Sequence, residues 1–485
     1  MLSLSAVFLA LVVCVLAAQY LKLQGWRRRY PPGPTPLPII GNLWTVRFNL
    51  QQETLMQLGK TYGNMFTLWM GQTPLIVLNG CHAVRDALIS HSEELYDRPP
   101  SPLLEAFLKG KGIFTTPEHT WKPLKRLGLT ILRILGLGKR SFQERIQEEV
   151  QWLTEAFAMT KGRAMDPCVA ITNSVTNVIA LVIFGHRYSC DDKEFLQLTK
   201  INTFLVAFLF SMSARLYNAF PWLMQHLPGT HQEFLNYYGF LNNFVNKEIQ
   251  IHKENLDPVE PQDFIDYYLN HMSTVSEDVN STYDEANMNH TVIEIFIGAT
   301  VPVSATLRTA LLLMATQPAI QEKVQKELDT VLGESHVIHY EDRERLPYVD
   351  AVMHEVLRYS NGGLCLRQAM KQTSLQGFTF EKGTYIVCNL YSLLNDSDYW
   401  LTPNQFNPGH FLDTEGRFVR NEAFMPFAAG PRACIGEQLA KTEIFLFFTS
   451  LLRAFTFRLP EGVKKVYMKR GALLPLPYEI CAVPR

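Results

Sequence analysis

The segment Phe427-Ala-Ala-Gly-Pro-Arg-Ala-Cys-Ile-Gly436 says most about the fold of this chain. It places Cys434 between two glycines and beside an arginine, directly before the apolar stretch 438–448. Glycine has no side chain, so the backbone here can come close to a flat macrocycle and its axial sulfur. A helix over 438–448 directs its positive N-terminal end at Cys434 and favours the ionised sulfur. The segment therefore predicts a thiolate ligand to haem iron, which promotes cleavage of the O–O bond.

A lone cysteine before a core helix is often buried and inert, and that is the alternative interpretation. Segment 427–436 meets every fixed position of the pattern Phe-x-x-Gly-x-Arg-x-Cys-x-Gly, which favours the haem ligand. The segment resembles the haem-binding signature of the cytochromes P-450. The resemblance covers nearly the whole chain and is closest to the microsomal animal members, in particular their second, drug- and lipid-metabolising family.

This resemblance implies the cytochrome P-450 fold, mainly α with a small β region, in a single large catalytic domain with an N-terminal membrane anchor. It also implies haem b as the cofactor and NADPH as the electron source, through NADPH-cytochrome P-450 reductase and with cytochrome b5 as a further partner. From the signature we expect Phe427, Gly430, Arg432 and Gly436 to surround the haem, with Cys434 as the axial ligand of its iron.

Composition excludes several other classes of protein. The 485 residues are 47% hydrophobic, enough for a large core, and the net charge of −1 gives no general attraction to nucleic acid. The eight cysteines are scattered and form no Cys-x-x-Cys pair. This argues against a disulfide framework or a zinc site and fits a reducing compartment.

The N-terminus predicts a membrane anchor. The chain carries no charge from Leu2 to Leu21, and about 20 such residues span a bilayer. Arg27, Arg28 and Arg29 follow, which keeps the C-terminal side in the cytosol. A cleaved secretory peptide, the alternative, would need basic residues within 1–6, where there are none. We therefore expect a transmembrane signal anchor over 1–25, a basic, proline-rich hinge over 26–40 and a haem-binding catalytic domain over 41–485, facing the cytosol on the endoplasmic reticulum membrane.

Four further segments indicate the organisation of the catalytic domain. Segments 67–70 and 75–78 predict a small β region, and the chain is mainly helical from about His82. Polar segment 247–285 predicts a surface connection. Segment 202–227 is rich in Phe and Leu, which fits either ordinary core packing or, as in relatives, a contact with the membrane.

Glu355 and Arg358 are three residues apart on a helix predicted over 349–359, so both lie on one face. An isolated Glu-x-x-Arg pair is usually solvated. The position of Glu355 and Arg358 upstream of His410 and Cys434, however, resembles the family's Glu-x-x-Arg pair and the histidine or arginine that bonds to it. The resemblance implies a buried network of Glu355, Arg358 and His410 whose loss prevents haem incorporation, because an unpaired buried charge costs several kcal/mol.

Hydrogen-bond donors also match positions that hold the haem propionates in relatives. The candidates are Trp121, Lys125, Arg98, Arg367 and Arg432. Lys125 stands where the family has arginine, and its ammonium group is a point charge that cannot form the bidentate contact of a guanidinium. The neighbouring Arg126 is an alternative donor to the propionate. The surrounding charges (Lys122, Lys125, Arg126, Arg133, Lys139 and Arg140) form either a solvated face or, as the resemblance implies, the surface that docks the acidic reductase.

The long apolar helix predicted over 293–314 resembles the helix that crosses the distal face of the haem. With the register set by segment 304–308, Val301 and Pro302 stand where relatives carry an acid and an alcohol. These two groups relay protons to bound dioxygen in the family, and valine and proline cannot. Thr300 and Ser304 fall on roughly the opposite face of the helix.

Pro302 offers an alternative route for protons. It has no N–H, so the carbonyl of Gly298, four residues back, loses its helical partner and could hold a water. Gly298, Thr300 and Pro302 therefore join Cys434 as candidate catalytic positions. The positions that line the substrate pocket in relatives are apolar here and imply an apolar substrate; they are Phe114, Phe208, Phe296, Leu364, Leu366 and Leu474.

Three functions remain open at this point. The first is a membrane-bound monooxygenase that oxidises apolar lipids or xenobiotics with O₂ and NADPH-derived electrons. The second is an isomerase of lipid hydroperoxides or endoperoxides, which needs no reductase and no proton relay. The third is a haem-containing ligand-binding protein with little turnover.

Overall fold

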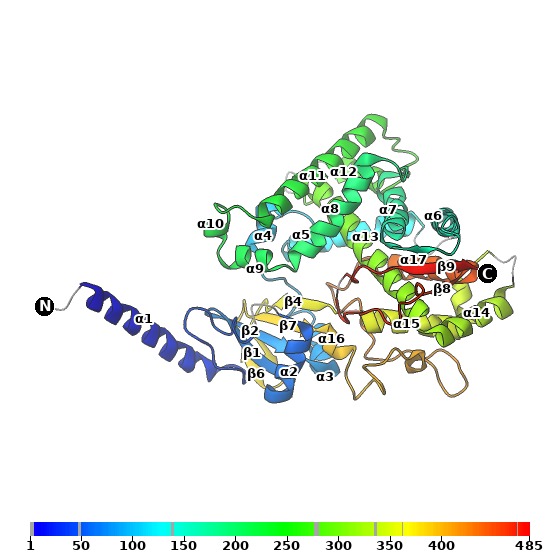
Figure 1. The fold of residues 1–485 in the computed structure, drawn as a ribbon. Helices are drawn as coiled ribbons and strands as arrows, with labels where there is room; N and C mark the ends of the chain where they lie inside the picture. The colour runs from blue at the N-terminus through cyan, green and yellow to red at the C-terminus, as the bar shows by residue number, and fades with distance from the viewer. Residues whose placement is uncertain are drawn as a thin grey trace. The chain divides into compact units, whose positions relative to one another are not determined.

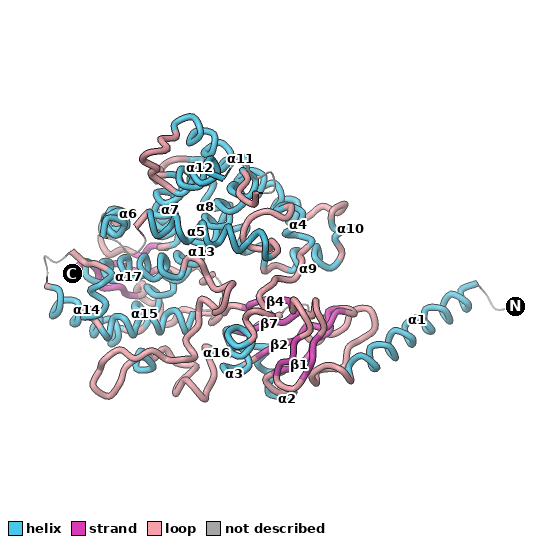
Figure 2. The backbone as a smooth tube through the Cα atoms, turned by 180° about the vertical axis from the view of Figure 1, so that it is seen from behind, coloured by secondary structure: helices cyan, strands magenta, loops and turns pink. Residues whose placement is uncertain are grey.

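The computed structural model describes residues 4–46, 50–136, 140–275, 281–333, 337–360, 362–472 and 474–485. They form two compact units, each assembled from separate stretches of the chain. The first unit comprises Met1–Pro99, Asn361–Gln405 and Asn421–Cys434, and the second comprises Pro100–Ser360, Phe406–Arg420 and Ile435–Arg485. Because the chain passes repeatedly from one to the other, they are parts of one domain. That domain is mainly helical with a small β region, as predicted (Figures 1 and 2).

The first unit is built around a four-stranded sheet. Its helices are α1 (Leu4–Arg27), α2 (Gln52–Tyr62), α3 (Gly80–Arg85), the π-helical turn Asp86–Ser90 and α16 (Leu390–Leu393). Its strands are β1 (Met65–Met70), β2 (Thr73–Leu78), β4 (Leu364–Gln368), β5 (Thr373–Leu375), β6 (Phe378–Phe380) and β7 (Tyr385–Asn389). Strands β5 and β6 form a separate hairpin.

The sheet has the order β1-β2-β7-β4 and joins distant parts of the chain. β1 and β2 confirm the predicted β region and pair antiparallel, with Phe66 opposite Val77. β2 then runs parallel to β7, with Val77 opposite Val387. These three side chains belong to one fully buried cluster, so burial of this face stabilises the pairing.

The proline-rich segment after α1 is held against β1. The backbone N–H and the hydroxyl of Thr67 donate to the carbonyls of Pro32 (3.0 Å) and Pro31 (2.9 Å). A Cβ atom on Gly33 would lie 2.0 Å from the carbonyl oxygen of Thr67. Only glycine fits there, which explains its place between the prolines.

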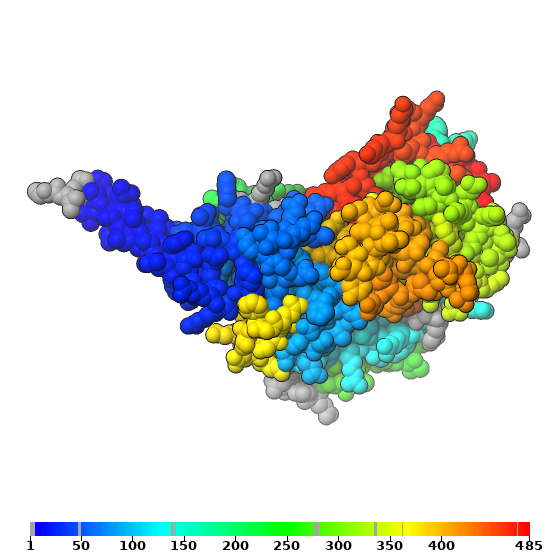
Figure 3. All heavy atoms as spheres, turned by 90° about the horizontal axis from the view of Figure 1, so that it is seen from below, coloured from blue at the N-terminus to red at the C-terminus, as the bar shows by residue number. Residues whose placement is uncertain are grey.

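Helix α1 is long and apolar enough to cross a membrane from Ser5 to Arg27, and only 6% of its most apolar stretch is buried. Figure 3 shows this dark-blue helix with most of its length uncovered. Among the described residues, Glu285–Thr316 also passes the test of length and composition, but 67% of its apolar stretch is buried. That second helix is therefore a core helix, and α1 is the membrane anchor.

The second unit contains the remaining helices and a small sheet. Its helices are α4 (Pro102–Leu108), α5 (Glu118–Ile134), α6 (Arg140–Ala158), α7 (Cys168–Phe184), α8 (Lys193–Leu209), α9 (Met212–Ala219), α10 (Pro221–Met224), α11 (Thr230–Asn255), α12 (Phe264–Val275), α13 (Glu285–Thr316), α14 (Pro318–Leu332), α15 (Pro347–Ser360), α17 (Glu437–Ala454) and the 3₁₀ turns Tyr340–Arg345 and Pro408–Phe411. Strands β3 (Ala164–Met165), β9 (Ile480–Pro484) and β8 (Phe455–Arg458) pair in that order.

Helix α13 is the centre of this unit and packs against α7, α11, α15 and α17. It begins at Glu285, earlier than the predicted 293, because the Asp284 side chain accepts a hydrogen bond from the Asn287 N–H (2.7 Å) and caps the helix. Pro302 lies inside the helix without ending it. Helix α15 confirms the prediction over 349–359.

The prediction that 247–285 is a surface connection was wrong over much of that range. Helix α11 continues to Asn255, and α12 buries Phe264, Ile265, Tyr268 and Leu269. Its apolar residues occur in pairs three and four apart, a helical pattern hidden by the polar residues around them. Residues 276–280 of this segment lie outside the described residues.

An ion pair joins α11 to the start of α12 and predicts a pH dependence of stability. The Nε2 atom of partly buried His252 lies 2.8 Å from Asp263 Oδ2, and its Nδ1 faces the Glu248 carbonyl oxygen (2.7 Å). Burial lowers the pKa of His252, but the hydrogen bond and charge of Asp263 outweigh it and raise the pKa to about 9. The folded pKa exceeds the unfolded value of about 6.5, so this stabilisation is complete below that pH and is lost as the pH rises to about 9.

The corresponding measurement is urea denaturation at several pH values. The free energy of unfolding is expected to fall by about 2 kcal/mol more between pH 6.5 and pH 9 in the wild type than in His252→Gln. Equal slopes in the two proteins would contradict the assignment. Asp266 also lies close to this pair, but both nitrogens of His252 already face partners, so we assign an ion pair rather than a metal site.

Candidate haem-thiolate site

The cysteine loop of the first unit is folded by two backbone hydrogen bonds. The Ala433 N–H donates to the Gly430 carbonyl (3.0 Å), and the Cys434 N–H donates to the Phe427 carbonyl (3.1 Å). Gly430 has a positive φ of 78°, and a Cβ atom there would lie 2.4 Å from the Leu88 carbonyl oxygen. The fold itself therefore requires glycine at position 430, and the loop leaves Cys434 exposed.

Helix α17 begins at Glu437, with Gly436 as its N-cap. The residue that carries the sulfur therefore comes directly before the start of a helix, as predicted. Gly436 has no side chain that could cap this end, so it leaves the partial positive charge of the first N–H groups of the helix in place.

Three arginines predicted to hold propionates belong to the first unit. Arg367 and Arg98 are both close enough to Cys365 to lower the pKa of its thiol, against a larger increase from burial. They are neighbours because Asp97 pairs with Gln368 at the end of β4. Arg432 is buried, with Nη2 3.6 Å from Asp97 Oδ1.

Arg367 provides a test of whether an anionic cofactor fits here. The side chain is 3% exposed, and its Nη1 donates to the Leu366 carbonyl (2.9 Å). Its Nη2 is buried and has no hydrogen-bond partner among the described residues. A buried donor left unpaired costs about 1–3 kcal/mol, so this atom fits an acceptor such as a carboxylate that the protein itself does not supply.

The second unit carries Trp121 and Lys125 on one face of α5. Trp121 is buried and Lys125 is partly exposed. Arg126 is exposed on another face, where Lys122 pairs with Glu118. Lys125, rather than Arg126, is therefore aligned with Trp121.

The predicted network of the second unit is present and buried. Arg358 donates two hydrogen bonds to Glu355, from Nε to Oε2 and from Nη2 to Oε1, both 2.7 Å long. His410 Nδ1 lies 3.2 Å from Glu355 Oε2, and the Asn407 N–H donates to Glu355 Oε1 (2.8 Å). Glu355 and Arg358 are fully buried, so the carboxylate holds α15 against the 3₁₀ turn at Pro408–Phe411.

Helix α13 exposes a narrow stripe. Gly298 and Pro302, one turn apart, are exposed, whereas Val301 is 1% exposed. Thr300 is fully buried, and its hydroxyl donates to the Phe296 carbonyl (2.7 Å). The Ser304 hydroxyl donates to the Val301 carbonyl (3.0 Å). Both alcohols are therefore turned away from the stripe that carries the Gly298 carbonyl.

Glu294, one turn before Gly298, is a residue that our sequence analysis missed. Its carboxylate accepts hydrogen bonds from the backbone N–H groups of Ile113 (2.6 Å) and Phe114 (3.1 Å). Gly112 leaves room for it, because a Cβ there would lie 2.7 Å from Oε2. Glu294 thus positions the loop that presents half-exposed Phe114. A single acid within the apolar stretch 291–301 was the available signal.

The predicted pocket residues are divided between the two units. Phe208 and Phe296 are buried in aromatic clusters of the second unit, stacked on Phe234 (4.6 Å between centroids) and tilted against Phe184 (5.7 Å). The others are partly exposed, with Leu364 and Leu366 on β4 of the first unit and Phe114 and Leu474 in the second.

Comparison with known proteins identifies the class. The family model described as Cytochrome P450 matches residues 31–482. The chain is 41% identical over 484 residues to Cytochrome P450 2J2 of Homo sapiens, covering 98% of this chain and 95% of the relative. It is 39% identical to Cytochrome P450 2J5 of Mus musculus, covering 94% and 92%, and 38% identical to Cytochrome P450 2C39 of Mus musculus, covering 95% of both.

The chain belongs to the cytochrome P450 family. It is an oxidoreductase of the haem-thiolate type, and within the family it is similar to microsomal animal members. The family uses haem b and NADPH-derived electrons delivered by a reductase. The exposed sulfur of Cys434 and the unpaired donor of Arg367 fit such an anionic porphyrin.

Proposed function

We propose that this protein is a monooxygenase of the endoplasmic reticulum membrane, with its catalytic domain in the cytosol, that oxidises apolar lipids or xenobiotics with O₂ and NADPH-derived electrons. Bound haem supplies the reductive activation of dioxygen. Cys434 would bind its iron through the thiolate, Arg98, Arg367 and Arg432 would hold its propionates, and Trp121 and Lys125 are further candidates for that role. Buried Arg367 is the best supported of these candidates, because its Nη2 has no hydrogen-bond partner among the described residues.

The stripe on α13 carries the proposal for proton delivery. Val301 and Pro302 have no exchangeable side-chain proton, and Thr300 is bonded to the backbone on the buried face. Pro302 has no N–H to donate to the carbonyl of Gly298, and Gly298 is an exposed residue. A water bound to this carbonyl, or a hydroxyl of the substrate, takes the place of the acid–alcohol pair.

Substitution of Pro302 tests this relay. Pro302→Ala restores the N–H that pairs with the Gly298 carbonyl and adds no hydroxyl, so product per NADPH consumed is expected to fall at least about twofold. Pro302→Thr adds a hydroxyl on the exposed stripe and is expected to raise that ratio about twofold above the wild type. Substitution at the fully buried Val301 is avoided because a carboxylate there would be desolvated.

The matched control is Thr300→Val, which removes a hydroxyl of the same helix on its buried face. It is expected to leave product per NADPH unchanged. A Pro302→Ala protein with the wild-type ratio would reject the water relay.

Two surfaces of the second unit support the membrane and reductase parts of the proposal. Exposed apolar side chains gather at α9 and α10 and beside them: Phe210, Met212, Leu216, Phe220, Trp222, Leu223 and Leu227. Such a patch suits contact with a membrane. Lys122, Arg126, Arg133 and Arg140 are exposed and form a basic face for the reductase, with cytochrome b5 as a further partner; Lys139 lies outside the described residues.

The second candidate is an isomerase of lipid hydroperoxides or endoperoxides, favoured by Val301 and Pro302 because such substrates bring their own oxygens. The purified protein would then convert lipid hydroperoxides without NADPH or reductase. Recovery of unchanged hydroperoxide would reject it. A ligand-binding protein with little turnover would shift its Soret band on binding ligand and form no product in either assay.

A further inference from the structure

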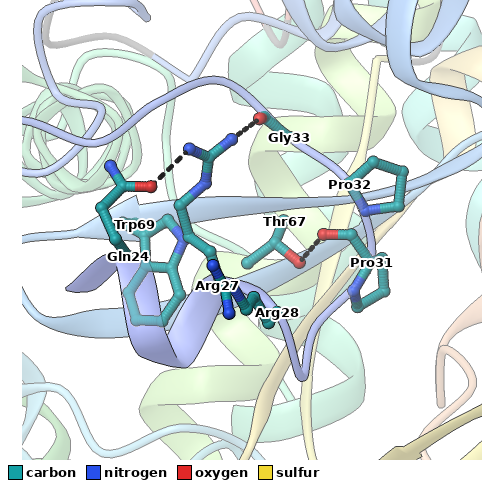
Figure 4. Close-up of a pocket in the computed structure, with 8 residues that line it drawn as sticks. All are labelled: Gln24, Arg27, Arg28, Pro31, Pro32, Gly33, Thr67 and Trp69. Carbon is teal, nitrogen blue, oxygen red and sulfur yellow. Dashed lines mark hydrogen bonds between the residues drawn. The ribbon is translucent and has the colours of Figure 1, made fainter. Parts of the chain in front are cut away.

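A pocket of about 270 Å³ lies in the first unit where α1 ends beside β1 (Figure 4). Its lining comes from the last turns of the helix, from the proline-rich segment and from the strand: Gln24, Arg27, Arg28, Pro31, Pro32, Gly33, Thr67 and Trp69. Trp69 is one of these lining residues and is itself stacked against Trp26, with 6.3 Å between the ring centroids.

The acceptors in the pocket wall are already used. The Pro31 and Pro32 carbonyls accept from Thr67, and the Gly33 carbonyl accepts from Arg27 Nη2 (2.9 Å). Figure 4 shows the Arg27 guanidinium lying between Gly33 and Gln24, whose Oε1 accepts from Arg27 Nη1 (3.0 Å). Arg27 is thus committed to holding the end of α1 onto the proline-rich segment.

Donors remain in the same wall. Gln24 Nε2 is buried and has no hydrogen-bond partner among the described residues, because the other end of that amide is fixed by Arg27. Arg28 lines the pocket, and no hydrogen bond or ion pair of its side chain occurs in the described part of the chain. The wall therefore offers donors, an amide N–H and a guanidinium, while its acceptors already have partners. Such a wall suits an anion with several oxygens, such as a phosphate.

The position of the pocket selects the source of that phosphate. Helix α1 is the membrane anchor and ends at Arg27, so its last turn lies at the level of the lipid headgroups. Lys22, 4.7 Å above the Trp26 ring, and Arg29 add positive charge at the same end. We propose that this pocket binds the phosphate of an anionic phospholipid through Arg28 and Gln24, and so sets how the anchor joins the catalytic domain at the membrane surface.

The test uses the full-length protein reconstituted in phosphatidylcholine vesicles that contain a minority of phosphatidylserine. After mild solubilisation, the lipids retained by the protein are counted by native mass spectrometry. The wild type is expected to retain phosphatidylserine in excess of its share in the vesicles. Arg28→Gln is expected to reduce this enrichment about tenfold more than Arg29→Gln, because only Arg28 lines the pocket.

Arg29→Gln is the matched control, since it removes the same charge one residue away. Its effect measures the part of the enrichment that comes from general attraction to an anionic surface. Gln24→Leu, which keeps every charge, is expected to reduce the enrichment as well. Equal effects of Arg28→Gln and Arg29→Gln would overturn the site in favour of general attraction. Displacement of the lipid by millimolar inorganic phosphate would assign the pocket to a soluble anion and overturn the lipid assignment.

Discussion

Replacing Glu355 by alanine is expected to lower the free energy of unfolding by about 3–5 kcal/mol and to prevent haem incorporation. The fully buried Arg358 would lose both of its 2.7 Å hydrogen bonds to this carboxylate. The Asn407 N–H would lose its acceptor, and His410 would lose its charged partner. A buried cation without a counter-charge is far costlier than the loss of an exposed ion pair. Denaturation by guanidinium and the ratio of Soret to protein absorbance measure the two effects.

The matched control removes an exposed ion pair of the same unit. Glu415 lies 3.0 Å from Arg417, and both side chains are about two-thirds exposed. Glu415→Ala is expected to change the free energy of unfolding by no more than about 0.5 kcal/mol and to leave the haem content unchanged. If Glu355→Ala cost no more than Glu415→Ala, the network would not be the element that stabilises the haem-side core.

Cys434→Ser is expected to abolish the red-shifted band of the reduced carbon monoxide complex. A serine hydroxyl is not ionised at neutral pH, whereas a thiolate before the N-terminus of α17 is favoured by the helix dipole. The reduced carbon monoxide difference spectrum of gently prepared protein is the measurement. A variant that keeps the band would show that the sulfur ligand comes from another cysteine.

Cys190→Ser provides the comparison, because Cys190 is also exposed but lies in the second unit, far from the signature in sequence. Its spectrum is expected to match that of the wild type. Loss of the band in both variants would indicate a general effect of cysteine replacement on folding.

Much of this architecture could be predicted from local patterns. The uncharged run from Leu2 to Leu21 indicated α1, the spacing of Glu355 and Arg358 indicated one helical face, and the apolar run before Gln317 indicated α13. Each depends on the period of a helix, a property of neighbouring residues. The helix α12 was missed because its buried face is interleaved with polar residues.

Contacts between distant segments could not be predicted. The parallel pairing of β2 with β7 joins residues about 300 positions apart, and no local pattern specifies such a partner. The hydrogen bonds from the Ile113 and Phe114 N–H groups to Glu294 also join residues that are far apart in the sequence. An acid in an apolar helix signals a buried partner without saying which backbone N–H groups will meet it.

The sequence alone determined the features on which the function depends. They are a cysteine in a haem-binding signature, a Glu-x-x-Arg motif, an apolar N-terminal helix and a distal helix without an acid or alcohol at 301 and 302. These features depend on which residues stand a few positions apart, and helical and turn geometry follow from that spacing. Tertiary structure alone decided which polar atoms have no partner among the described residues, such as Arg367 Nη2 and Gln24 Nε2. Hydrogen-bond satisfaction is a property of the whole packed environment, because a donor is paired or unpaired only once every segment around it has taken its place.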